Sequence, residues 1–319
     1  MLKYSVVIPA HNAEKYLPLA LESVRAQRLS PEAVIVVNDG SSDATAEIAA
    51  SYDAVVITHR IARGPSAARN AGVAACSTEL VAFLDADDEW TPEHAEKTVG
   101  VHNYPGVIFS ASRAVCIGSE SFAVPSPDIG EEPLDLREML VLENPIIQSC
   151  VVIRRDIFEQ SGRYDESMRF AEDYDLWNRV AELGLFCPVV TASVRRRIHD
   201  DQVSLRFTPK MVAGAWQVRR TTAARRFPSL SESAHRDLVQ LLCEGARRDI
   251  ASAVWTGEAA LLSLVRDEME RTDADLQLNG ALAAVGGDSM SVMRLAQDIR
   301  CRAYKIRSRL RSWRGRSVL

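Results

Sequence analysis

The chain has 319 residues, of which 47% are hydrophobic and 25% are charged, so its apolar content is too high for a chain that is disordered throughout. At roughly 100–200 residues per domain, this length predicts two domains or one large domain with an extension. The net charge of −5 argues against a general nucleic-acid binder. Because residues 300–319 hold eight Arg or Lys and no acid, the first 299 residues carry −13. Such an acidic body suits a metal cation that bridges to an anion.

The first hundred residues alternate short apolar runs with segments of helical spacing. Strands are expected over residues 4–9, 33–37, 54–58 and 80–84. Helices are expected between them, over residues 17–24, 43–50 and 64–75. Repeated β-α-β units of this length predict an α/β fold, a parallel sheet with helices on both faces. Ligands of such sheets bind at the carboxyl ends of the strands.

From about residue 107 the pattern changes. Short strands are expected over residues 107–109, 115–117, 146–153 and 188–197, and a helix over residues 173–183. Residues 118–135 are rich in Ser, Pro, Gly and acids, which predicts a mobile loop. After about residue 207 the sequence becomes rich in Ala, Leu and Arg, so the division predicted is a catalytic domain over 1–205 and a helical region over 206–319.

Carboxylates follow two of the predicted parallel strands. Asp39 follows the second strand, and Asp85, Asp87 and Asp88 follow the fourth. Four carboxylates at one edge of a sheet repel one another, and a divalent cation is the simplest group that neutralises them. A single Asp-x-Asp is more often a solvated loop or a helix cap. The first strand leads to a third polar end at His11 and Asn12, and this convergence favours a Mn²⁺ or Mg²⁺ site that also holds a diphosphate.

The familiar phosphate-binding loops are missing, since the chain has neither G-x-x-x-x-G-K-[ST] nor G-x-G-x-x-G after a strand. Residues 64–72, Gly-Pro-Ser-Ala-Ala-Arg-Asn-Ala-Gly, instead place small residues at a helix start, where backbone N–H groups can approach a phosphate. Arg69 on the next turn could pair with that charge. Close packing of the helix on the sheet explains Gly64 equally well.

These segments together resemble the inverting, family 2 type glycosyltransferases with a GT-A fold. The resemblance extends over roughly residues 1–205, and the order of its motifs is more specific than any one of them. The matching segments are residues 5–12 (SVVIPAHN), 37–43 (VNDGSSD), 67–72 (AARNAG), 83–88 (FLDADD), 162–166 (GRYDE), 172–177 (EDYDLW) and 197–199 (RIH).

The resemblance implies a role for each matching position. Asp39 would bind the nucleobase or its ribose, Asp85 the ribose or sugar, and Asp87 the metal. His199 would complete the metal or diphosphate site, although a lone His there is more often a surface residue. The residues implied to bind the nucleotide sugar are Pro9, Ala10, His11, Asn12, Asp39, Arg69, Asp85 and Ala86. His11 stands where an aromatic residue is frequent in the family.

Asp173 is implied to be the catalytic base. Inverting transfer needs a carboxylate opposite the leaving group to take the proton of the acceptor hydroxyl, while a metal offsets charge on the departing nucleoside diphosphate. A helix that begins at Glu172 would favour an ionised Asp173 through its dipole. Without the other motifs, Glu172 and Asp173 would be ordinary helix-start acids.

The sequence therefore predicts a metal-dependent, inverting glycosyltransferase that moves a sugar from a nucleotide-diphosphate sugar, with a UDP-sugar preferred, to a glycan or lipid-linked acceptor. A sugar-phosphate nucleotidyltransferase would require a Gly-rich basic loop after the first strand, where this chain has Pro9 to Asn12. A non-catalytic binding module is the second alternative, and intact Asp85, Asp87 and Asp173 argue against it. A processive synthase is disfavoured because no Gln-x-x-Arg-Trp motif is present.

The six cysteines form no C-x-x-C pair, which favours reduced thiols and a cytoplasmic protein. Apolar residues from Val292 to Trp313 recur at three- and four-residue steps and predict a basic amphipathic helix. Residues 292–316 could therefore contact an anionic membrane surface. A helix packed on the acidic body, or a contact in a homo-oligomer, explains the same pattern.

Overall fold

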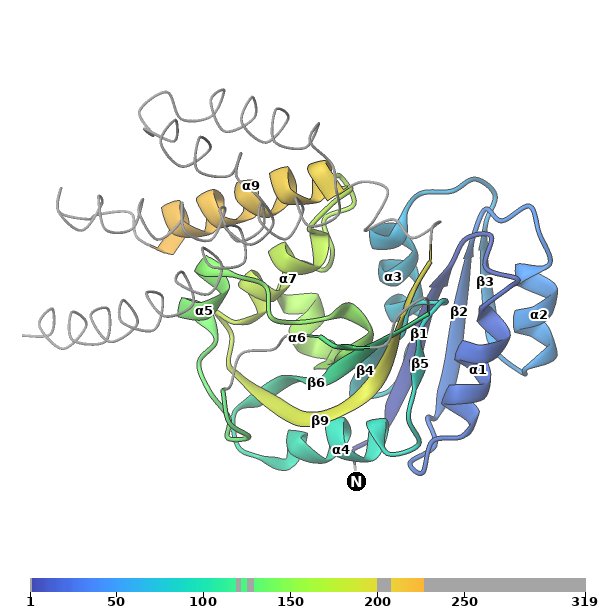
Figure 1. Ribbon diagram of the computed structural model, residues 1–319, viewed down its shortest axis with the longest axis horizontal. Helices are drawn as coiled ribbons and strands as arrows, with labels where there is room; N and C mark the ends of the chain where they lie inside the picture. Colours follow the sequence, from blue (N-terminus) through green and yellow to red (C-terminus); the bar gives the residue numbers. More distant parts are fainter. Residues whose placement is uncertain (1, 119–121, 125–128, 200–207, 227–319) are drawn as a thin grey trace, which may run out of the picture. The chain divides into compact units, whose positions relative to one another are not determined.

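The computed structural model describes residues 2–118, 122–124, 129–199 and 208–226 (Figure 1). The chain divides into two compact units, one of residues 1–140 with 144–202 and one of residues 141–143 with 203–319. The predicted boundary at residue 205 lies outside the described residues. The first unit holds the sheet and every predicted site residue, and the second contributes helix α9 (Thr208–Arg226).

The amino-terminal half is built from β-α-β units, as predicted. Its elements in chain order are β1 (Tyr4–Ala10), α1 (Leu17–Arg25), β2 (Ala33–Asp39), α2 (Thr45–Ser51), β3 (Val55–His59), α3 (Pro65–Ala74) and β4 (Leu80–Phe83). Buried apolar runs form β1, β2 and β4, as expected of strands covered by helices on both faces, whereas the edge strand β3 is only partly buried. Helix α1 buries Leu17, Leu21 and Val24 and carries proline in its first turn.

The strands lie in the order β3-β2-β1-β4, so the chain first adds strands on one side of β1 and then places β4 on its other side. Both neighbours of β1 are parallel to it, with Val7 paired to Ile35 on one side and to Phe83 on the other. Because such crossovers are right-handed, α3 covers the face opposite to α1 and α2 (Figure 1). The boundary between β1 and β4 is therefore a topological switch point of the sheet. Open α/β sheets bind their ligands at the carboxyl ends of the strands at such a point.

The remaining strands extend the sheet in mixed directions. Strand β8 runs antiparallel to β4 and β6, and β9 runs parallel to β6 and antiparallel to β5. The described residues form nine strands in one sheet. The further elements are β5 (Glu89–Trp90), α4 (His94–Gly100), η1 (Val101–Asn103), β6 (Val107–Gly118), β7 (Phe122–Ala123), α5 (Arg137–Leu142), η2 (Gln148–Cys150), β8 (Val151–Arg154), α6 (Arg155–Gln160), α7 (Glu172–Val180) and β9 (Leu185–Ile198).

Three predicted strands after residue 107 are wrong in their limits. Residues 107–109 and 115–117 belong to one twelve-residue strand, β6. Its polar middle is accommodated because the Ser110 hydroxyl donates to the Thr98 carbonyl at 2.9 Å and the Ser112 hydroxyl lies 3.3 Å from His94 Nδ1. Residues 146–153 form the 3₁₀ turn η2 and then β8, because the Ser149 carbonyl accepts a bond from the Trp90 indole at 2.8 Å.

Other expectations meet the structure more closely. The predicted helix over 173–183 is α7, and the predicted strand over 188–197 is β9. Part of the predicted loop over 118–135 forms β7, and its residues 119–121 and 125–128 lie outside the described residues. Among the described cysteines, Cys76, Cys116, Cys150 and Cys187 are free and buried. No helix in the described ranges is long and apolar enough to cross a membrane.

Candidate active site

The ends of β1 and β2 are tied together by side chains. The His11 ring donates through Nδ1 to the Asp39 carbonyl at 2.7 Å. The Asn12 carboxamide oxygen accepts from the Ser42 backbone N–H at 2.8 Å, and Asn12 itself has a φ of 49°. Pro9 and Ala10 are the last residues of β1, whereas His11 and Asn12 are exposed. The structure thus places His11 and Asn12 as an exposed rim beside Asp39, with Ala10 buried beneath them.

Asp39 is buried at the end of β2, with its carboxylate directed at the chain after β3. It accepts bonds from the His59 ring at 2.6 Å, from the Arg63 N–H at 2.9 Å and from the Gly64 N–H at 2.8 Å. Burial raises the pKa of Asp39, but these hydrogen bonds outweigh it and hold the pKa below its ordinary value. Asp39 therefore orders the loop that leads into α3, and its contact with a nucleoside stays a prediction.

Arg69 of α3 joins Asp85, at the end of β4, to helix α7, which carries Asp173. Its side chain is 6% exposed and donates to Asp85 Oδ1 at 2.8 Å and to Glu172 Oε1 at 3.1 Å. Its guanidinium also lies 5.4 Å from the centre of the Tyr164 ring. The structure thus places Arg69 on two carboxylates of the chain itself, and pairing with a substrate phosphate stays a prediction.

Asp87 and His199 come together from distant parts of the sequence. His199 Nε2 lies 3.0 Å from Asp87 Oδ2, and both side chains are partly exposed. Burial and the neighbouring Asp85 raise the pKa of Asp87, whereas His199 lowers it. Among the described residues no group of three or more His, Cys, Asp or Glu could hold a metal. A cation at Asp87 and His199 would therefore fill its shell with water or phosphate oxygens, as Mg²⁺ commonly does.

Asp88 is the buried member of the acidic run. It accepts a bond from the Ser149 hydroxyl at 2.6 Å and from the Arg197 N–H at 2.9 Å. Burial and the charges of Asp87 and Asp85 raise the pKa of Asp88 to about 8. Asp88 therefore fastens the acidic loop to β9 and η2, while buried Ala86 provides a spacer between Asp85 and Asp87.

Asp173 lies in the first turn of α7, beside the acids of the β4 end. It accepts its own helix's Tyr174 N–H at 2.7 Å and the Asn144 side chain at 3.3 Å. Burial and the adjacent Glu172 raise the pKa of Asp173 to about 7, although Arg69 acts in the opposite direction. A carboxylate with a pKa close to neutral suits a general base.

Sequence reasoning missed Tyr16 and Asn144. The Tyr16 ring lies 4.9 Å from the His199 ring and 5.0 Å from the Arg197 guanidinium, so it packs against the strand end that carries His199. Asn144 lies before η2, between the predicted loop over 118–135 and the predicted strand over 146–153, and no motif marks it. Neither residue could be found without the pairing of distant segments.

The loop before α7 is fixed by Asn70, the residue after Arg69. Its amide donates to the Tyr164 carbonyl at 2.9 Å and accepts from the Tyr164 N–H at 3.1 Å. Arg63 forms an exposed ion pair with Glu166 at 2.8 Å. Arg69 and Asn70, which are adjacent in α3, thus hold the segment that carries Asp173 against the strand ends of the parallel sheet.

Residues 5–162 match the sequence model of Glycosyl transferase family 2. The chain belongs to this family. An uncharacterized glycosyltransferase of Rickettsia typhi is 28% identical over 207 residues, 63% of this chain and 65% of the relative. An amylovoran biosynthesis glycosyltransferase of Erwinia amylovora is 29% identical over 57% of this chain and 70% of its own length. The chain thus spans just under two thirds of the length of the first of these relatives.

Solved structures agree on the fold. TarS of S. aureus, residues 1–349, superposes with a TM-score of 0.61 at 17% identity, over 94% of this chain and 92% of the TarS chain. At this identity the likeness concerns the fold, which is the GT-A-type α/β fold expected from the sequence. The family 2 chain described here therefore has the architecture predicted from its strand and helix pattern.

Proposed function

We propose that this protein is a metal-dependent, inverting glycosyltransferase that moves a sugar from a nucleotide-diphosphate sugar to an acceptor hydroxyl. The observation that carries the proposal is the Arg69 bridge, which holds Asp85 and Glu172 in one network beside Asp173. Asp85 and the proposed base Asp173 are thus held in a fixed arrangement relative to each other. A single displacement at the anomeric carbon requires this arrangement, because the base must approach from the face opposite the leaving group.

The proposed donor is a UDP-sugar. TarS, which shares the fold, has been solved in complex with UDP-GlcNAc. In this chain residues 9–12 and the loop ordered by Asp39 would enclose the nucleoside. Asp85, which follows β4 beside β1, would face the ribose or the sugar.

Asp87 and His199 are the residues proposed to hold Mn²⁺ or Mg²⁺. His199 Nε2 and Asp87 Oδ2 lie 3.0 Å apart, and a cation would offset the burial and the Asp85 charge that raise the pKa of Asp87. A bound divalent cation supplies charge neutralisation at a diphosphate leaving group. The chain's own residues do the rest: Asp173 takes the acceptor proton and Asn144 orients its carboxylate.

The proposed acceptor is a hydroxyl of a glycan or a lipid-linked sugar in cell-surface glycan synthesis. One relative is named for amylovoran biosynthesis, which supports a glycan acceptor for this chain as well.

A thermal-shift panel tests the proposal. UDP-, GDP- and TDP-sugars are added with and without Mn²⁺, and a ligand that binds the native state raises the melting temperature by mass action. We expect the largest rise with a UDP-sugar plus Mn²⁺, and we expect Asp87→Ala to remove the Mn²⁺-dependent part. The exposed Asp53→Ala is the matched control. An undiminished Mn²⁺ effect in Asp87→Ala would contradict the metal role.

A further inference from the structure

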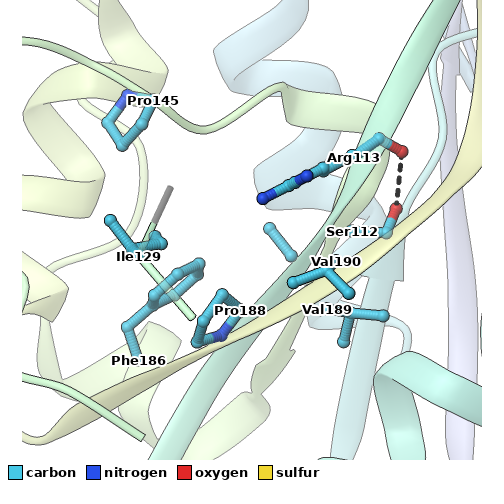
Figure 2. A pocket seen from close by; sticks show the side chains of 9 residues that line it. Ser112, Arg113, Ile129, Pro145, Phe186, Pro188, Val189 and Val190 are labelled. Carbon is cyan, nitrogen blue, oxygen red and sulfur yellow. Dashed lines mark hydrogen bonds between the residues drawn. The ribbon is translucent and has the colours of Figure 1, made fainter. Parts of the chain in front are cut away.

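A small hollow lies over the paired strands β6 and β9 (Figure 2). Its cavity volume is about 30 Å³, and it is open to solvent. Its walls are formed by side chains of β6 and β9 together with Ile129 and Pro145. Apart from Ser112 and Arg113, the lining is apolar. This volume holds one or two water molecules, so a larger ligand can place only a small polar group in the hollow.

Among the described residues that line the hollow, Arg113 is the only charged one, and its guanidinium points into the hollow (Figure 2). Within the described part of the chain, its guanidinium makes no hydrogen bond or ion pair. Other arginines in this half do find acids, as Arg179 does with Asp175 at 2.7 Å and Arg195 with Glu89 at 3.7 Å. A guanidinium against apolar walls is costly unless an anion pairs with it.

The strand pairing aims Arg113 in this direction. The β6–β9 register shifts on both sides of Arg113, between Ser112 and Arg113 and again between Arg113 and Ala114. A bulge of this kind redirects a side chain, and bulges are common beside active sites. The Ser112 hydroxyl lies 3.2 Å from the Arg113 carbonyl and holds the backbone at this point. The bulge therefore sets the direction in which the Arg113 side chain leaves the strand.

The hollow adjoins the residues that orient the proposed base. Pro145 lines the hollow, and its chain neighbour Asn144 donates to the Asp173 carboxylate at 3.3 Å. A second bond, from the Ile146 N–H to the Asn144 side-chain oxygen at 3.1 Å, fixes the segment on the other side of Pro145. A group held in the hollow would therefore lie beside the element that positions Asp173.

We propose that this hollow is an acceptor subsite in which Arg113 binds an oxyanion of the acceptor, a carboxylate or a phosphate. The inference rests on the proposed glycosyltransferase function and names the chemistry of its acceptor. A planar guanidinium can grip either oxyanion with two parallel hydrogen bonds. Neutral hydroxyls of the same sugar residue would then be presented to Asp173.

Arginine side-chain NMR tests this directly. The Arg113 Nε–Hε signal is assigned by its loss in Arg113→Gln, and the full-length protein is titrated with methyl β-glucuronide, inorganic phosphate and the neutral methyl β-glucoside. UDP and Mn²⁺ are present to fill the donor site. We expect a saturable shift of the Arg113 signal with one of the two anions and none with the glucoside. The anion that saturates at the lower concentration identifies the acidic group.

The control is the exposed Arg25 at the end of α1, assigned through Arg25→Gln. If the Arg113 signal stays fixed, or changes without saturation in the same way as that of Arg25, the proposal is wrong. Donor binding is measured separately by the thermal shift, which Arg113→Gln should leave unchanged. In transfer assays, Arg113→Gln should raise KM for the acidic acceptor roughly tenfold or more with kcat retained. If no nucleotide sugar raises the melting temperature in the thermal-shift panel, the proposed function is wrong. The NMR result for Arg113 is independent of that outcome.

Discussion

At the scale of single residues, the proposed base has a carboxyl group whose protonation changes near neutral pH. Burial and Glu172 raise the pKa of Asp173 to about 7. Only the ionised form can take a proton, so activity should fall about tenfold per pH unit below pH 7 and level off above it. Asp173→Asn should keep the donor thermal shift and reduce kcat by roughly 10²–10⁴-fold. Transfer assays from pH 5 to 9 check this, and Asp175→Asn in the same helix serves as control.

Arg69 carries a second prediction at this scale. Removing it leaves the partly buried Asp85 and Glu172 without their shared cation, which typically costs about 3–5 kcal/mol for a buried pair. Arg69→Met should therefore lower the melting temperature, and Arg69→Lys, which cannot fork to both acids, should recover stability better than kcat. Arg63→Gln, at an exposed pair with Glu166, should change neither by much. Equal kcat in Arg69→Lys and the native protein would refute the positioning role.

The sequence predicts those site residues that come directly after a strand or at the start of a helix. Asp85 and Asp87 follow β4, and Asp173 opens α7, as expected. The sequence could not reveal what these side chains touch, because each contact joins segments far apart in the chain. Arg69 was expected at a phosphate, yet it lies on two acids, and Asn144 was not expected at all. Such contacts depend on tertiary packing, which residue spacing does not encode.

At the scale of elements, helix α3 depends on a glycine. A Cβ added at Gly72 would lie 2.4 Å from Val7 Cγ1 and 3.2 Å from Val37 Cγ2, so α3 packs directly on β1 and β2. Gly72→Ala should force α3 away from the sheet and destabilise the protein by about 1–3 kcal/mol, as measured by urea unfolding. Since Arg69 lies one turn earlier in α3, transfer should fall as well. Gly100→Ala in α4, where nothing lies within 4 Å, should be neutral.

The elements that sequence patterns predict well are those with uniform burial. Strands β1, β2 and β4 are apolar throughout their buried parts, and their ends were correct to within two residues. Strand β6 was divided in two because Ser110 and Ser112 interrupt its apolar run. Hydrogen bonds to α4 satisfy both serines inside the core. A polar residue in a buried strand is thus predictable only once its partner is known.

At the scale of the whole molecule, charge is divided along the chain. The first 299 residues carry −13, and part of that charge lies at the β2 and β4 ends of the first compact unit. The basic stretch over residues 300–319 belongs to the second unit and lies outside the described residues. The predicted amphipathic helix over 292–316 therefore stays a prediction from sequence. Its charge pattern can be tested without its structure.

Binding to anionic vesicles is the test at this scale. Each Lys or Arg near an anionic surface contributes about 1 kcal/mol, so the eight basic residues of 300–319 should dominate binding of an otherwise acidic chain. Deleting residues 300–319 should abolish cosedimentation with phosphatidylglycerol vesicles at low salt while leaving the donor thermal shift intact. Binding of the full chain should weaken steeply with ionic strength, because exposed charges are screened within about 10 Å at 0.1 M salt. If the full chain binds neutral phosphatidylcholine vesicles equally well, or if the deletion changes nothing, the basic segment has a partner other than the membrane.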